Sequence, residues 1–357
     1  MGMRRTAILL VICATSLVAP TLLCLAVLLT QVRSGVEFLV LIAAAEAWMA
    51  ALWLANWWEF TGLSLRWVWF VALSAVVAGR WLAAPAPWRR EFGASGIAST
   101  VVLALALAVL VPALRARRHP GRPLELRLPL QGGRFLVADG GDGAASFFVN
   151  YHYGFPGHRA KGVSASMRYA TDIVEIGRFG CEAPWLLPPR NEDYRIWGRP
   201  VHAPCDGVVA QAVNDVVDNT AFGSHRPYGV GNHVVIRTGA DVYVVLGHLR
   251  QGSVRVRPGE ALRAGEVLGE VGNSGWTERP HIHLQAMCAP DGNYWRGDPV
   301  PMRFDGRFLV KNQALKAGAA SGAGPPRGAA ATPPRPAAAS PGTPSPPHLD
   351  SSGSRPG

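Results

Sequence analysis

The sequence has few charged residues and few cysteines. Only 17% of its 357 residues are charged and 49% are hydrophobic, a balance that is unusual for a wholly soluble protein. The five cysteines form no C-x-x-C pair, so a cysteine-rich structural zinc site is not expected. One disulfide among Cys181, Cys205 and Cys288 is compatible with their spacing but is not required by it.

The chain also lacks a basic region large enough to suggest nucleic acid. Its net charge of +11 comes mainly from its two ends, because residues 123–312 hold 20 basic and 19 acidic groups. A nearly neutral domain does not generate the positive field that phosphate backbones require. We therefore predict no nucleic-acid partner.

Four apolar stretches predict a helical transmembrane region over residues 1–118. No charge occurs from Thr6 to Val32, and about 20 apolar helical residues cross a bilayer. The second and third stretches are weaker because they contain Glu46 and Arg80. The alternatives are a soluble four-helix core, disfavoured because no polar stripe is present, and a cleaved signal peptide for the first stretch. The predicted helices cover residues 7–30, 38–58, 67–84 and 97–114.

The orientation in the membrane has conflicting signals. With four spans both termini share one side, and Arg115, Arg117 and Arg118 after the last span would place that side in the cytoplasm. The same arginines suit lipid headgroups, so a lipid membrane is a predicted partner. If residues 67–84 are re-entrant, three spans place the C-terminal domain outside. We expect an integral membrane protein whose C-terminal domain is extracytoplasmic, although the positive-inside rule favours the opposite orientation.

Residues 123–312 predict an all-β extramembrane domain. Short Val-rich runs alternate with Gly, Asn and Asp, and no long segment with a helical period interrupts them. This pattern predicts an antiparallel β-sandwich or a compact barrel with polar loops. The Pro/Ala/Ser-rich residues 313–357 are predicted to be a disordered tail, because such a composition buries too little apolar surface to fold. A wall-threading or partner-binding role for the tail is the alternative.

Three histidines and one aspartate could form a reactive site. His281 and His283 occupy alternate positions of a predicted strand, so both project from one face of it. His248 ends the alternating run DVYVVLGHL, and Asp172 begins another apolar run. One carboxylate with imidazoles is a common zinc ligand set, whereas H-x-H alone also fits two solvent-facing histidines.

These segments occur in a characteristic order. Asp172 is followed by VHAPCDGVV, LGHL, VRPGEALRAGEVLG, GNSG and PHIHL, over about 160 residues. This order resembles the lysostaphin-like, LytM-type zinc metalloendopeptidases that have a duplicated hybrid motif. The resemblance implies that Asp172 and His283 bind zinc (Zn²⁺) and that His248 and His281 assist catalysis. It also implies hydrolysis of peptide bonds in bacterial peptidoglycan, so peptidoglycan peptides are the expected substrate.

The sequence departs from this family at one expected ligand. The family usually has a histidine four residues before the aspartate, where this chain has Arg168. A guanidinium offers only donors and cannot bind a metal. The resemblance favours His152 as the replacement ligand, with His158 as the second choice.

Two other functions are compatible with the motifs. A non-catalytic relative could bind or activate cell-wall enzymes, and Arg168 is its main support. A phosphohistidine carrier would use paired histidines such as His248 and His281, and no lysine lies near residues 262–265 for a lipoyl-type carrier. Of the remaining histidines, His202 is expected to be structural, while His225 and His233 are candidates for substrate contact.

Overall fold

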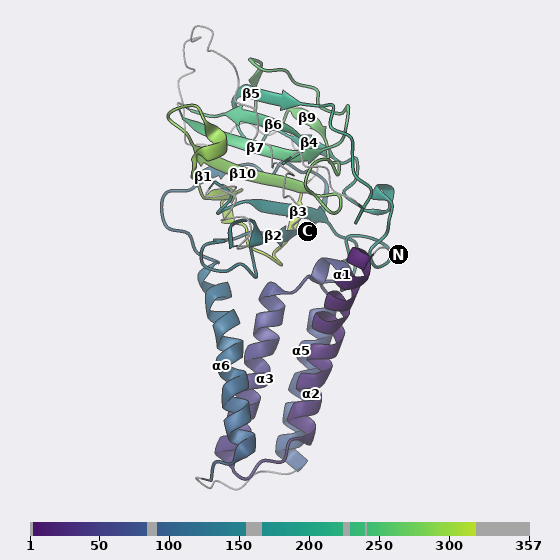
Figure 1. Ribbon diagram of the computed structural model, residues 1–357, viewed down its shortest axis with the longest axis vertical. Coiled ribbons are helices and arrows are strands. Elements are labelled where there is room, and N and C mark those ends of the chain that lie inside the picture. Colours follow the sequence, from purple (N-terminus) through teal and green to yellow (C-terminus); the bar gives the residue numbers. More distant parts are fainter. Residues whose placement is uncertain (1–2, 84–90, 155–165, 224–228, 240, 319–357) are drawn as a thin grey trace, which may run out of the picture.

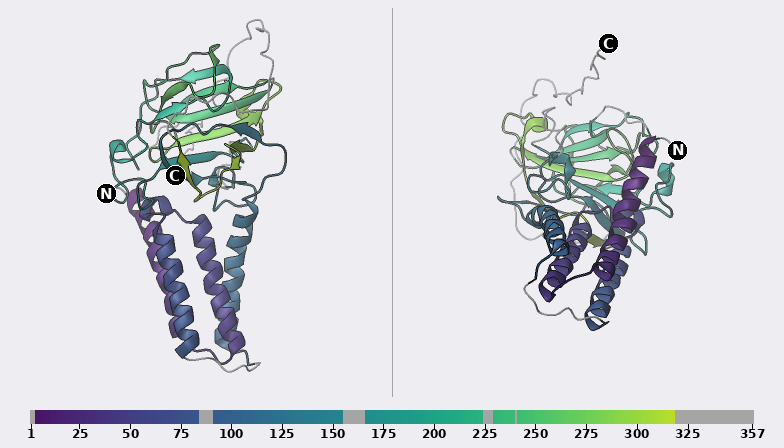
Figure 2. Two further views of the ribbon diagram at one scale, coloured as in Figure 1. Left: turned by 180° about the vertical axis from the view of Figure 1, so that it is seen from behind. Right: turned by 60° about the horizontal axis from the view of Figure 1, so that its bottom comes forward.

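A helical bundle lies against a β-rich domain in the computed structural model of this chain (Figures 1 and 2). The N-terminus and the β-rich domain lie at the same end of the bundle (Figure 1). The candidate histidines His158 and His225 fall outside the described residues. The structure describes residues 3–83, 91–154, 166–223, 229–239 and 241–318.

Four helical segments of the bundle are long and apolar enough to cross a membrane. The first, Arg4–Leu29, combines α1 (Met3–Cys13), a π-helical segment (Ala14–Val18) and α2 (Ala19–Leu29). The others are α3 (Gly35–Ala55), α5 (Leu65–Ala83) and α6 (Ala94–Arg115). The third predicted segment is thus part of a continuous helix of 19 residues.

Arg80, the charged residue that made the third segment a weaker transmembrane prediction, has hydrogen-bond partners in the structure. The Arg80 guanidinium donates hydrogen bonds to the carbonyl oxygens of Val27 at 3.0 Å and Thr30 at 2.7 Å, at the end of α2. A cation near a helix C-terminus also interacts favourably with the partial negative charge of the last carbonyls. An arginine in α5 is therefore compatible with a membrane-spanning helix.

The β-rich domain contains mostly antiparallel sheets, as the alternating runs predicted. The largest sheet has the order β14-β2-β3-β10-β7-β6-β5-β8, with β11 pairing with β10, and two small sheets, β1-β12-β13 and β4-β9, lie beside it. Among the described pairings, β1 with β12 is parallel, unlike the prediction. The strands are β1 (Leu124–Leu126), β2 (Gly133–Asp139), β3 (Thr171–Glu175), β4 (Pro200–His202), β5 (Gly207–Val213), β6 (Asn232–Arg237), β7 (Val242–Leu249), β8 (Ala261–Leu262), β9 (Val267–Glu270), β10 (Ile282–Cys288), β11 (Asp298–Pro299), β12 (Met302–Phe304), β13 (Arg307–Phe308) and β14 (Ala314–Ala317).

The predicted tail boundary is too early by a few residues. Strand β14 pairs with β2, and Leu315 is buried in the main apolar core. Burial of one leucine together with a row of strand hydrogen bonds offsets the entropy of ordering these residues.

The disulfide that the cysteine spacing permitted does not form. Cys181, Cys205 and Cys288 are all free.

Polar contacts fix the β-rich domain on the ends of the helices. The Asn312 side-chain amide donates to the carbonyl oxygens of Leu54 at 3.1 Å and Asn56 at 2.9 Å, at the C-terminal end of α3. The Arg279 guanidinium bridges Glu182 of the β-rich domain at 2.9 Å and Glu59 at 3.0 Å in the short helix α4 (Trp58–Thr61). Because Arg279 is two residues before His281, this bridge connects the bundle directly to the candidate site.

Candidate metal centre

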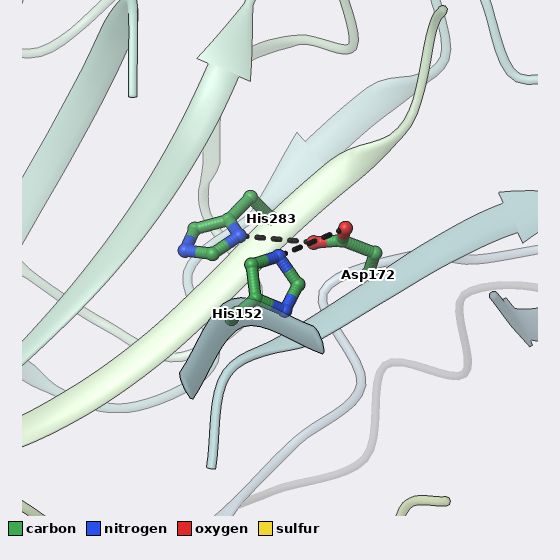
Figure 3. A group of neighbouring side chains, drawn as sticks. All are labelled: His152, Asp172 and His283. Carbon is green, nitrogen blue, oxygen red and sulfur yellow. Dashed lines mark hydrogen bonds and ion pairs between the residues drawn. The ribbon is translucent and has the colours of Figure 1, made fainter. Parts of the chain in front are cut away.

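Three neighbouring strands of the large sheet bring the candidate residues together. In the antiparallel pair β3–β10, Asp172 is directly opposite His283. On the other side of β10, His283 is opposite Gly247, the residue before His248. The short helix α7 (Tyr151–Gly154) adds His152 from a loop (Figure 3). Residues separated by up to 131 positions in the chain therefore share one site.

Both oxygens of the Asp172 carboxylate face imidazole nitrogens. His283 Nδ1 lies 2.9 Å from Oδ1, and His152 Nε2 lies 3.1 Å from Oδ2 (Figure 3). One ligand atom from each of the three residues lies within 4.8 Å of the others. Neighbouring ligand atoms of a tetrahedral zinc ion are about 3.4 Å apart, as follows from zinc–ligand bonds of about 2.0–2.1 Å. The three side chains are thus close enough together to hold one metal ion jointly.

Hydrogen bonds on the far sides of the two rings leave the other nitrogen of each ring facing Asp172. The Asn150 side-chain oxygen lies 3.0 Å from His152 Nδ1, and the Gln285 side-chain oxygen lies 3.0 Å from His283 Nε2. If each amide oxygen accepts a hydrogen bond from its ring, the other nitrogen of that ring in its neutral tautomer turns a lone pair toward Asp172. Lone pairs that face a carboxylate repel one another unless a cation lies among them. The donor set therefore fits a zinc ion.

The two proposed catalytic histidines lie beside this group. His281 Nε2 is 3.4 Å from Asp172 Oδ2, and the His281 and His248 ring centroids are 4.8 Å apart. His281 Nδ1 is 2.9 Å from the Arg279 carbonyl oxygen, which leaves Nε2 as the proton acceptor. Burial lowers the pKa of His281 to about 4, and burial together with the neighbouring imidazoles holds the pKa of His248 well below its usual range. Both rings are neutral near pH 7.

The glycine-rich loop before the H-x-H motif holds His248 in place. The Ser274 carbonyl oxygen lies 2.8 Å from His248 Nδ1, and His248 itself has a positive φ of 59°. A Cβ on Gly231 would lie 2.2 Å from that same carbonyl oxygen, and one on Gly275 would lie 2.3 Å from the backbone nitrogen of Gly231. These glycines permit two backbones to touch. Their contact orients His248.

Arg168, at the usual ligand position, has a different role in this structure. Its guanidinium makes a two-pronged ion pair with Asp142, with both N–O distances at 2.7 Å. The Asn150 amide group donates to the carbonyl oxygens of Arg168 at 3.3 Å and Ala170 at 3.0 Å. Arg168 therefore stabilises the loop that carries His152, and no pattern in the sequence predicted its ion pair with Asp142.

We expect Arg168→Ala to destabilise the protein without removing the metal. Asp142 is buried and would lose its ion-pair partner, which costs about 1–3 kcal/mol of unfolding free energy. Chemical denaturation of the variant measures this loss, and metal analysis of the same sample should still find zinc. The paired variant His152→Ala should lose zinc; the opposite outcome, zinc lost in Arg168→Ala and kept in His152→Ala, would reassign the third ligand.

The other predicted histidines lie away from the candidate ligands. His202 is on β4 in a separate two-stranded sheet, with its Nδ1 3.3 Å from the Pro129 carbonyl oxygen. His233 is buried, and its two ring nitrogens lie 2.6 Å and 3.3 Å from oxygens of Gly231 and Gln211. A buried ring with both nitrogens engaged offers no free atom to a substrate.

Comparison with known proteins found a family match for part of the chain. Residues 193–295 match peptidase family M23. This part of the chain is therefore similar to M23 peptidase domains. The matched range includes His248, His281 and His283, while Asp172 and His152 precede it.

Two curated relatives of the M23 domain are named as endopeptidases. The glycyl-glycine endopeptidase ALE-1 of Staphylococcus capitis is 30% identical over 104 residues, which are 29% of this chain and 25% of the relative. The peptidoglycan DD-endopeptidase ShyA of Vibrio cholerae is 27% identical over 137 residues, 36% of this chain and 29% of the relative. The alignments thus span between a quarter and a third of each relative.

Two solved peptidase structures are also similar to part of this chain. A zinc-containing peptidase from Vibrio cholerae has 19% identity and a TM-score of 0.29, with 50% of this chain and 39% of the other covered. The catalytic domain of lysostaphin from Staphylococcus simulans has 22% identity and a TM-score of 0.21, covering 29% of this chain and 73% of the other.

Proposed function

We propose that this chain is a membrane-anchored zinc metalloendopeptidase that hydrolyses peptide bonds in bacterial peptidoglycan. The observation that carries the proposal is the convergence of His152, Asp172 and His283, with His248 and His281 beside them, at an M23 domain. The names of the two curated relatives support the substrate class. The family match favours a peptidase over the phosphohistidine carrier.

His152, Asp172 and His283 would hold the zinc ion. Zinc bound there would polarise the scissile carbonyl and lower the pKa of water toward about 7. The Nε2 atoms of His281 and His248 are assigned the proton transfers, since each Nδ1 is occupied by a backbone carbonyl oxygen. One Nε2 would accept a proton from the attacking water, and the imidazolium formed there would donate that proton to the leaving amine.

Gln285 is proposed to be a positioning residue for the metal ligand His283. Its side-chain oxygen is 3.0 Å from His283 Nε2, and its own side chain is buried. Loss of such an outer partner typically lowers metal affinity 10–100-fold. We expect Gln285→Leu to bind zinc about 10–100-fold more weakly, as measured by competition with a chromophoric chelator, while Gln285→Glu, which retains an acceptor, should bind more tightly than the leucine variant. Equal affinities in all three proteins would exclude this role.

The four long helices are proposed to span the membrane and to hold the peptidase domain outside the cytoplasm. All four are apolar, and the N-terminus lies at the same end of the bundle as this domain (Figure 1). An alkaline phosphatase fusion after residue 318 should be active and a green fluorescent protein fusion dark. The reverse pattern would put the domain in the cytoplasm, away from the mature wall.

The function is tested on purified peptidoglycan. Full-length protein in detergent, loaded with zinc, should release peptides with new amino termini that mass spectrometry identifies. The variant Asp172→Asn should release none. Zinc-loaded wild-type protein that binds peptidoglycan without cutting it would instead support the non-catalytic binding or activator module.

A further inference from the structure

The candidate metal centre opens into a cavity that continues between the membrane helices. The cavity has a volume of ≈ 1370 Å³, and its lining includes His152, Asp172 and His283 at one end. Ligand pockets in proteins usually measure about 300–1,000 Å³. Its size therefore exceeds what a short wall peptide alone requires.

The other end of the cavity is formed by the first, second and fourth membrane helices. Trp48 is seven residues before the end of α3 at Ala55, and Val109 is six residues before the end of α6 at Arg115. At 1.5 Å per residue, the cavity reaches about 10 Å along these helices. The membrane end is mainly apolar, and its lining includes Ile8, Val11, Thr15, Trp48, Leu52 and Val109.

Exposed aromatic side chains border the cavity where the bundle meets the peptidase domain. Phe147 and Phe148 are 41% and 46% exposed, and Trp276, which lies in the loop before His281, is 40% exposed. Aromatic rings of this kind are favoured at the level of lipid headgroups. Their position suits a ligand that passes from the hydrocarbon layer to the metal centre.

The two ends of the cavity require two kinds of ligand chemistry. Water in an apolar space is unfavourable in free energy. By contrast, each CH₂ group that moves from water into such a space contributes about 0.8 kcal/mol of favourable transfer free energy. A soluble peptide would contact the histidines and leave the membrane end without an apolar partner. A peptide joined to a long hydrocarbon chain would occupy both ends at once.

We propose that the substrate is a peptidoglycan peptide that is still attached to its membrane lipid. This inference rests on the proposed function and names the substrate class of the same site. The hydrocarbon chain lies between α1, α3 and α6, and the peptide reaches the metal centre. Hydrolysis breaks one amide C–N bond; the hydroxyl of water joins the carbonyl carbon and its proton joins the nitrogen, while the lipid linkage stays intact.

The test compares two probes that differ only in the lipid. Full-length protein in lipid nanodiscs is given a disaccharide pentapeptide linked to polyprenyl diphosphate, or the same disaccharide pentapeptide without lipid. We expect kcat/KM to be about 100-fold higher for the lipid-linked probe, since several buried CH₂ groups contribute to its binding. Equal kcat/KM values for the two probes would overturn the inference and leave the proposed peptidase function intact.

Two matched variants locate the lipid. Val109→Trp narrows the cavity and should reduce the ratio of the two kcat/KM values toward one. Val111→Trp changes the same residue type two positions away, on a side chain that is 38% exposed and does not line the cavity, and should keep the wild-type ratio. A ratio that is unchanged in Val109→Trp would contradict the location.

A crosslinking measurement tests binding of the lipid chain independently of peptide hydrolysis. Metal-free protein is irradiated with a lipid-linked probe whose hydrocarbon chain carries a diazirine, and crosslinks are expected on the α3 and α6 segments that contain Trp48 and Val109. Crosslinks there, combined with no hydrolysis of either probe by the zinc-loaded protein, would support the lipid site and refute the proposed peptidase function. Equal cleavage of an acylated peptide of unrelated sequence would overturn the assignment to wall peptides.

Discussion

Replacing His283 by alanine is expected to abolish both zinc binding and peptide hydrolysis. His283 Nδ1 is 2.9 Å from Asp172 Oδ1, and the ring is almost completely buried between β3 and β7. Its loss removes one of three proposed ligands, so zinc affinity should fall by more than the 10–100-fold typical of a lost outer partner. Metal analysis after dialysis and peptide release from purified peptidoglycan measure the two effects.

His202→Ala is the control for His283→Ala. His202 is also a buried strand histidine, but it lies in the β4–β9 sheet and contacts the Pro129 carbonyl oxygen. We expect this variant to retain wild-type zinc content, whatever its loss of stability. Zinc retention by His283→Ala, or zinc loss by both variants alike, would remove His283 from the ligand set.

Replacing His281 by alanine is expected to separate catalysis from metal binding. Its Nε2 lies 3.4 Å from Asp172 Oδ2, next to the proposed ligands, and its Nδ1 is bound to the Arg279 carbonyl oxygen. Loss of a general acid or base typically lowers the rate 10²–10⁴-fold. The variant should keep a full complement of zinc and lose about that factor in kcat on a peptidoglycan peptide.

The comparison of His281→Ala with His283→Ala decides between their assigned roles. If the two histidines have different roles, His283→Ala should lose its zinc and His281→Ala should keep it, while both variants lose most of their activity. Metal loss of equal size in the two variants would mean that His281 is also a ligand. A fully active His281→Ala protein would transfer the proton role to His248 alone.

Alternation in the sequence predicted the strands that carry the candidate residues, whereas the family resemblance grouped Asp172 with His283. His283 and Asp172 each belong to apolar runs of strand-like composition, and antiparallel pairing places them opposite each other. His248 follows from the same pattern on β7. The partner Gln285 could also have been predicted, because it is two residues after His283 and so projects from the same face of β10.

His152 could not be derived from a periodic pattern. It lies in the four-residue helix α7, and its position depends on the Asn150 amide group, which contacts three backbone carbonyl oxygens. Such loop geometry comes from individual side-chain hydrogen bonds, which leave no repeating trace in a sequence. The choice of His152 came from the family resemblance.

The contact between the helical bundle and the β-rich domain could also not be predicted from the sequence. Hydropathy identified the four apolar segments, but it says nothing about which loop caps which helix. The contacts of Asn312 with Asn56 and of Arg279 with Glu59 each link residues more than 200 positions apart. Arg279 and Glu59 line the cavity that joins the apolar helices to the candidate metal centre.

X-ray absorption at the zinc edge of the full-length, zinc-loaded protein tests the central claim most directly. If His152, Asp172 and His283 hold the ion together, the spectrum contains two imidazole nitrogens and carboxylate oxygen at about 2.0–2.2 Å, and no sulfur. The variant Asp172→Asn should lose that signature. A spectrum with sulfur ligands, or one that is the same in wild type and Asp172→Asn, would contradict the account.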